Sequence, residues 1–206
     1  ITEDKDGKVV CARIGTYGET IHTLIERHEY HGVHLPGYKT INSFAHEGFG
    51  LFAIDHIVGN VDLGAMGLWA DYYAKVMGFT SLVHFSDSQI STEYSALMSK
   101  VMWDSTGRIK FPINEPALGK RRSQIEEYLT FYRGPGVQHI ALETESIIDT
   151  VSLLRARGVE FLTIPYAYYE SARARFSDVP EVDIDMLAKL GILADRDEEG
   201  YLLQIF

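Results

Sequence analysis

The sequence is poor in cysteine, in long apolar runs and in positive charge. Its single cysteine, Cys11, excludes a disulfide within the chain and favours a reducing compartment. No apolar run approaches the roughly 18 residues that a membrane-spanning helix needs. The first residues also lack the charged-then-apolar pattern of a secretory leader. From these absences we expect a cytoplasmic protein with no membrane partner.

Positive charge is scarce, because 19 lysines and arginines face 29 aspartates and glutamates for a formal net charge of −10. This acidic balance argues against nucleic acid or an anionic membrane surface as the main partner. The one basic run, at 120–122, is interpreted as a solvated loop. With 46% hydrophobic and 23% charged residues, the chain is expected to bury a substantial core in one large domain or two small ones.

Residues 1–38 are predicted to form a hairpin and an exit loop. Strands are expected at 8–14 and 20–27, because a glycine turn signal precedes each. The loop after them is rich in glycine and proline, which opposes the helix that would bring residues at intervals of three onto one face. We therefore interpret its three histidines as part of a solvated linker and not as a metal site: His28, His31 and His34.

From residue 51 the pattern becomes strand, helix, strand, strand, strand. The first strand has His56 at its centre. Asp62 is placed to cap the following helix, and Gly78 ends it. The buried face of that helix is predicted from spacings of three and four, at Met66, Trp69, Tyr73 and Val76. The three later strands are expected at 79–85, 92–99 and 108–114.

A second unit of this kind follows a polar, partly helical segment at 115–133. It opens on a strand centred on His139, and a helix at 146–157 comes next, which Gly158 ends. The remaining expectations are a strand at 159–164, an insertion at 165–191 with one helix at 185–190, and strands at 192–194 and 201–206.

The two units share a phase, since 22 residues separate His56 from Gly78 and 19 separate His139 from Gly158. We interpret them as an internal structural repeat, with modules at about 51–116 and 136–206. By this repeat one further strand should follow residue 206. The chain is therefore expected to be a piece of a longer protein.

A histidine at the centre of each opening strand is the pattern of a metal site. Taken alone, such a histidine is more often a core residue bonded to a carbonyl or to water. Two neutral imidazoles suit Fe(II), Zn(II), Ni(II) or Cu(II), and with one carboxylate they form the facial triad of non-haem Fe(II) oxygenases. The carboxylate is expected on the strand that the sequence lacks, and Glu115 is a weaker candidate within it.

Several short motifs occur in a specific order across nearly all of the chain. They are Ile54-Asp55-His56, Val58-Gly59-Asn60, Ser95-Ala96-Leu97, Pro112-Ile113-Asn114-Glu115-Pro116, 120–125 with Ser123-Gln124, Gly136-Val137-Gln138-His139, 192–197 and Leu202-Leu203-Gln204-Ile205-Phe206. Their joint order resembles the 4-hydroxyphenylpyruvate dioxygenase family of the vicinal oxygen chelate superfamily. The resemblance implies an α+β vicinal oxygen chelate fold, in which paired βαβββ modules form an open, incomplete β-barrel with helices outside.

The resemblance also implies a division into domains. Residues 1–38 would be the closing hairpin of an otherwise absent amino-terminal domain. Residues 39–206 would be the carboxy-terminal catalytic domain, without its last strand and terminal helix.

The activity implied is the conversion of 4-hydroxyphenylpyruvate and O2 to homogentisate and CO2, in tyrosine and phenylalanine catabolism. The cofactor is Fe(II), and the expected assembly is a homodimer or homotetramer. Iron performs the oxygen chemistry while the protein supplies geometry and excludes competing reactions. A glutamate beyond Phe206 would be the third ligand, so we expect residues 1–206 alone to be weakly active or inactive.

By the same resemblance His56 and His139 are the first two iron ligands, and Gln204 belongs with them to the catalytic set. Neutral polar groups would orient a phenol and a keto acid without adding charge. Strand alternation turns Gln138 away from the face of His139, so either the strand twists there or Gln138 acts from a second layer. The substrate-binding residues implied are Val58, Ser95, Pro112, Asn114, Gln124, Gln138, Gln204 and Phe206.

Two alternatives stay open. Hydroxymandelate synthase uses the same substrate, iron and scaffold but hydroxylates the benzylic carbon; the 112–114 stretch favours the ring-hydroxylating enzyme. The other alternative is an inactive, truncated vicinal oxygen chelate module that binds a small molecule.

Overall fold

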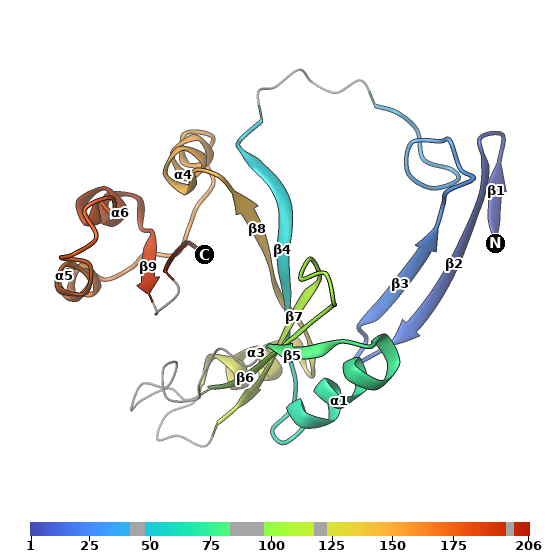
Figure 1. Ribbon diagram of the computed structural model, residues 1–206, viewed down its shortest axis with the longest axis horizontal. Coiled ribbons are helices and arrows are strands. Elements are labelled where there is room, and N and C mark those ends of the chain that lie inside the picture. Colours follow the sequence, from blue (N-terminus) through green and yellow to red (C-terminus); the bar gives the residue numbers. More distant parts are fainter. Residues whose placement is uncertain (42–47, 83–96, 118–122, 197–199) are drawn as a thin grey trace. The chain divides into compact units, whose positions relative to one another are not determined.

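The computed structural model describes five stretches, and within them the chain divides into two compact units (Figure 1). Unit 1 comprises Ile1–Phe44 and Ile54–Leu142, and unit 2 comprises Ala45–Ala53 and Glu143–Phe206. The predicted boundary near residue 38 does not correspond to a division between these units, and the assignment of 1–38 to an amino-terminal domain stays a prediction. The described residues are 1–41, 48–82, 97–117, 123–196 and 200–206.

Unit 1 begins with a three-stranded antiparallel ribbon. Its strands are β1 (Thr2–Asp4), β2 (Gly7–Gly15) and β3 (Ile21–Glu26), in that order. The last two match the predicted strands to within one residue at each end. All three histidines of the following loop are exposed, as a solvated linker requires.

A five-stranded sheet lies mainly in unit 1, in the order β5-β6-β7-β4-β8. Strand β6 runs antiparallel to β5 and β7, whereas β4 and β7 are parallel where Gly59 and Asn60 meet Ile113 and Asn114. The predicted strand, helix, strand, strand, strand pattern is thereby confirmed. Of the strands expected at 79–85 and 92–99, the parts within 83–96 lie outside the described residues. The strands are β4 (Leu51–Asn60), β5 (Thr80–Leu82), β6 (Leu97–Trp103), β7 (Lys110–Pro116) and β8 (Gly136–Thr144).

Helix α1 (Met66–Met77) ends as predicted, with Gly78 in the left-handed conformation at φ 68°. Its start differs from the prediction, because Asp62 does not cap it. The buried carboxylate of Glu115, on β7, accepts the Met66 backbone N–H at 2.9 Å instead. A negative charge is favourable at this end of a helix, where backbone N–H groups lack partners within the helix.

The buried face of α1 also differs from the prediction at one end. Met66 and Tyr73 are buried as expected, and Ala70 joins them, whereas Val76 is 51% exposed. The three buried residues of α1 pack with Tyr17, Val61, Met102 and Ile113 to form the core of unit 1.

The ribbon contacts the rest of unit 1 at its β2–β3 end, which lies beside α1 in Figure 1. His22, on β3, shares a 2.8 Å hydrogen bond with the hydroxyl of Tyr73. The Tyr17 hydroxyl occupies the space that a Cβ atom at position 59 would need, so Gly59 allows this close approach. The remaining helix of the unit, α3 (Gln124–Tyr132), starts with a capping box of Ser123 and Glu126.

Unit 2 contains α4 (Ile147–Ala156), α5 (Tyr166–Arg175) and α6 (Ile184–Leu190), with a two-stranded antiparallel sheet of β9 (Leu193–Arg196) and β10 (Tyr201–Gln204). The prediction of α4 is confirmed, and the structure adds that the Ser146 side chain caps it by accepting the Asp149 N–H. No helix among the described residues of either unit is long and apolar enough to cross a membrane.

One prediction for unit 2 is wrong, and one helix of this unit was not predicted. Residues 159–164 form no strand; the Leu162 N–H donates to the Phe206 carbonyl at 2.6 Å, without the paired ladder that defines a strand. Helix α5 was not expected, because its apolar residues do not gather on one face of the helix.

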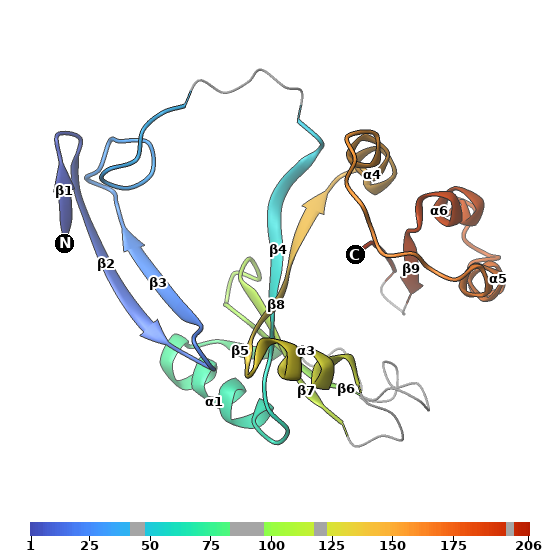
Figure 2. The same ribbon diagram turned by 180° about the vertical axis from the view of Figure 1, so that it is seen from behind.

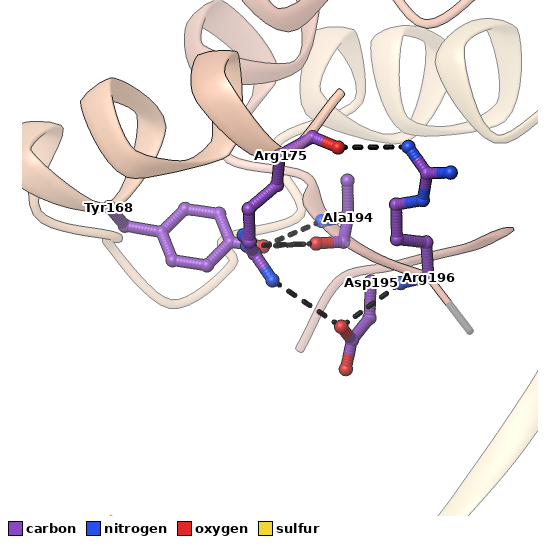
Figure 3. A network of polar contacts seen from close by, with 5 residues as sticks. All are labelled: Tyr168, Arg175, Ala194, Asp195 and Arg196. Atoms are coloured by element: carbon purple, nitrogen blue, oxygen red, sulfur yellow. Dashed lines mark hydrogen bonds and ion pairs between the residues drawn. The ribbon is translucent and has the colours of Figure 1, made fainter. Parts of the chain in front are cut away.

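Strand β9 is attached to α5 by the polar network in Figure 3. The Tyr168 hydroxyl donates to the Ala194 carbonyl at 2.6 Å and accepts the Ala194 N–H at 2.8 Å. Arg175 also donates to that carbonyl, and Arg196 donates to the carbonyl of Arg175 at 2.9 Å. These contacts fix β9 against α5 and, through strand pairing, fix β10, which contains Gln204.

Candidate metal centre

The two histidines of the predicted metal site lie side by side within unit 1. Strands β4 and β8 run next to each other in Figures 1 and 2, and they present His56 and His139 with ring centroids 5.5 Å apart and planes at 73°. Both rings are partly buried. The structure thus brings together two residues that are 83 positions apart (139 − 56) in the sequence.

The ring of His56 is oriented by a carboxylate. Its Nδ1 lies 2.6 Å from Oδ2 of Asp55, and the other oxygen of Asp55 accepts a short hydrogen bond from Nζ of Lys110. A carboxylate accepts only, so the His56 proton is assigned to Nδ1 and the lone pair to Nε2. Nε2 is then the nitrogen that would bind a metal.

The ring of His139 is oriented in a parallel way by an amide. Its Nδ1 contacts Oε1 of Gln138, the residue that precedes it on β8. Donation to this oxygen again assigns the proton to Nδ1 and the lone pair to Nε2. Gln138 therefore contacts the imidazole of His139, and its role toward a substrate stays a prediction.

Burial favours neutral imidazole at His139, and hydrogen bonds favour ionised carboxylate at Asp55. Burial lowers the pKa of His139, and the neighbouring His56 lowers it further. Burial alone would raise the pKa of Asp55, but the hydrogen bonds from His56 and Lys110 outweigh it and the pKa is lowered. A neutral histidine is the form that binds a metal.

Three predicted substrate-binding residues lie on the two strands that pair in parallel. Val58, on β4, is only 3% exposed, while Pro112 and Asn114 are partly buried on β7. The strand register sets Asn114 opposite Asn60. Val58, Pro112 and Asn114 therefore lie in the same sheet as His56.

The other predicted residues are dispersed. Gln124 is exposed at the first position of α3. Gln204 and Phe206 belong to unit 2, where Gln204 ends β10 and Phe206 is 49% exposed. Ser95 lies outside the described residues.

A third metal ligand is absent from the part of the chain that the structure describes, where no group of three histidine, cysteine, aspartate or glutamate side chains could hold an ion. Glu115 was a candidate within the sequence. Its carboxylate instead bonds the start of α1, so it serves the fold.

Sequence reasoning assigned no role to Asp55 or Lys110. A signal for Asp55 was present, because a ligating histidine usually donates its second ring N–H to a carboxylate and Asp55 adjoins His56. No such signal existed for Lys110, which reaches Asp55 only because β7 lies beside β4.

Comparisons with known proteins identify the family of this chain. The 4-hydroxyphenylpyruvate dioxygenase of Coccidioides posadasii is 50% identical over 212 residues, covering 99% of this chain and 53% of that protein. That of Tetrahymena thermophila is 49% identical over 214 residues, with the same coverage. This chain therefore spans about half the length of the curated relatives that it matches.

A solved structure and a family also match. A triple mutant of 4-hydroxymandelate synthase from Streptomyces coelicolor aligns with a TM-score of 0.72 at 29% identity, covering 95% of this chain and 55% of that one. These likenesses confirm the resemblance and the vicinal oxygen chelate fold inferred from the motifs. Residues 53–205 match the model of the Glyoxalase/Bleomycin resistance protein/Dioxygenase superfamily, and the chain therefore belongs to that superfamily.

Proposed function

We propose that this chain is part of an Fe(II)-dependent dioxygenase that converts 4-hydroxyphenylpyruvate and O2 to homogentisate and CO2. The observation that carries the proposal is the pair of adjacent imidazoles, each with its Nδ1 engaged by the preceding residue. The relatives at 49–50% identity are named 4-hydroxyphenylpyruvate dioxygenase, which is the enzyme of this reaction. The reaction belongs to tyrosine and phenylalanine catabolism.

The residues present fit iron as two of the three ligands in a facial triad. His56 and His139 would bind through Nε2, and a glutamate outside this sequence would complete the set. When bound, Fe(II) supplies the activation of O2 and leaves positions for a bidentate 2-oxoacid.

The chain's own residues would bind and orient the substrate. Val58 provides an apolar contact, and Asn114, two positions after Pro112 on β7, provides an amide for the phenol or the keto acid. We propose that Gln204 and Phe206 contribute an amide and a ring from β10 and the segment after it. Ser95, Gln124 and Gln138 complete the proposed set, with Gln138 acting through His139.

Product analysis of the full-length, Fe(II)-loaded protein tests this proposal. Homogentisate should form from 4-hydroxyphenylpyruvate, with release of CO2 and consumption of O2. The second candidate is hydroxymandelate synthesis, which the structural likeness to 4-hydroxymandelate synthase favours. It would yield 4-hydroxymandelate instead, and absence of both products would favour a non-catalytic binding module.

We further propose a cytoplasmic location and a homodimeric or homotetrameric assembly, with residues 1–38 completing an amino-terminal domain. Light scattering of the full-length protein would measure the assembly. A monomer at micromolar concentration would contradict that part of the proposal.

A further inference from the structure

We propose that Asp55, anchored by Lys110, is the positioning residue that orients His56 for metal binding. This inference rests on the proposed function, since it concerns a ligand of the proposed iron. Neither residue was given a role by the motifs.

Both oxygens of Asp55 are engaged, and each by a different strand. Oδ2 takes the Nδ1 proton of His56 on β4, at 2.6 Å, and Oδ1 takes a proton from Lys110 at the start of β7. Held at both ends, the carboxylate cannot rotate without breaking one bond. The orientation of the imidazole is thereby coupled to the pairing of β4 with β7.

Burial distinguishes this ion pair from the surface pairs of the chain. The side chains of Lys110 and Asp55 are 29% and 33% exposed, whereas those of Lys75 and Asp71, on α1, are 76% and 70% exposed. Solvent screens an exposed pair, so it adds little to structure or binding. A partly buried, charge-assisted bond is shorter and stronger, and it restricts the side chains that make it.

The charge of Asp55 has a consequence at the far side of the ring. A carboxylate that accepts the Nδ1 proton increases the basicity of Nε2, which strengthens its bond to a metal. At His139 the corresponding acceptor is the neutral amide of Gln138. The two proposed ligands therefore differ in donor strength, and His56 is the stronger.

Four variants of the full-length protein test the inference: Asp55→Asn, Asp55→Ala, Lys110→Met and the matched control Asp71→Ala. Asp55→Asn keeps the shape and one accepting oxygen, whereas Asp55→Ala removes the acceptor. The probe is Co(II) alone, added to metal-free protein. Its Kd and its visible absorption spectrum are measured, together with thermal unfolding before metal is added.

We expect the Kd for Co(II) to rise about 10- to 100-fold in Asp55→Ala, the range for loss of an outer-sphere partner. Asp55→Asn and Lys110→Met should lie between Asp55→Ala and the parent protein, each with a shifted Co(II) spectrum. Asp71→Ala should match the parent in both. A purely structural role would lower the unfolding temperature but leave the spectrum of the bound ion unchanged.

Equal Kd values and spectra for the parent, Asp55→Asn and Lys110→Met would overturn the inference, even if Asp55→Ala failed to fold. His56→Ala separates this outcome from failure of the proposed function. If His56→Ala weakens Co(II) binding and the Asp55 variants do not, only the positioning role fails. If His56→Ala binds Co(II) as the parent does, the ligand assignment itself fails.

Discussion

The strands β4 and β8 both carry a proposed ligand, yet they hold it differently. β4 is an inner strand, flanked by β7 and β8, and its histidine bonds to a carboxylate that a lysine of β7 anchors. β8 lies at the edge of its sheet, and its histidine bonds to an amide from the residue before it. One ligand is thus supported by tertiary structure and the other by local structure.

The two histidines share one local contact and differ in what lies beyond it. Both modules place an accepting side chain immediately before the histidine, so the same tautomer arises in each. Only the first module adds a charged residue from another strand. A ligand supported in this way should be harder to displace than one held by its neighbour alone.

The largest expected effect comes from removing either ligand. His56→Ala and His139→Ala in the full-length protein should each abolish Fe(II) retention. The loss of metal affinity should exceed the roughly 100-fold expected when a residue that only hydrogen-bonds a ligand is removed. Both variants should stay folded by circular dichroism, because each ring is only partly buried. Metal analysis after gel filtration is the measurement, with His34→Ala, an exposed loop residue, as control. Full iron occupancy in either variant would remove that residue from the site.

A second test separates the structural carboxylate of β7 from the positioning carboxylate of β4. Glu115→Ala leaves the Met66 N–H without its buried partner and removes a charge from the helix terminus, so the free energy of unfolding should fall by about 2 kcal/mol. Metal affinity should change little. Urea unfolding and Co(II) titration measure the two quantities, with the exposed Glu170→Ala as control. Lost metal affinity at full stability would return Glu115 to the list of ligands.

A third test breaks the neutral support of the second ligand. Gln138→Ala should raise the Kd for Co(II) by about 10-fold or less, the lower end of the range for loss of a residue that hydrogen-bonds a metal ligand. The reason is that a hydrogen bond to a neutral amide is weaker than a charge-assisted one. The exposed Glu143→Ala, on the same strand, is the control. An effect larger than that of Asp55→Ala would reverse the comparison between the two strands.

The smallest expected effect is on the pH dependence of stability and concerns His22, outside the proposed metal site, which shares a hydrogen bond with the hydroxyl of Tyr73. Burial lowers the pKa of His22, so the unfolded chain binds its proton more tightly than the folded protein. Its contribution to stability is present above the unfolded value of about 6.5 and is lost as pH falls toward the folded pKa. His22→Gln should reduce the loss of stability between about pH 7 and about pH 5, measured by urea unfolding of metal-free protein. An unchanged pH dependence would exclude His22 as its source.

Much of the fold was predictable, because local patterns decided it. Hairpin strands, the glycine that ends α1, helix α4 and the order of the first module follow from residues near one another in sequence. The predictions failed where the structure depends on contacts between residues that are far apart in the sequence. Glu115 replaces Asp62 at the start of α1, and α5 packs through Tyr169 and Ala172 without a clear apolar stripe. The roles of Gln124, Gln204 and Phe206 stay predictions.

The amino-acid sequence by itself determined the family and singled out the two histidines as a pair, because motif order and strand periodicity are properties of the chain alone. Only the tertiary structure decided that the rings lie 5.5 Å apart, that each Nδ1 has an acceptor and that Lys110 anchors Asp55. Hydrogen bonds act over about 3 Å. Lys110 comes within that range of Asp55, 55 positions away in sequence, only after β7 has paired with β4.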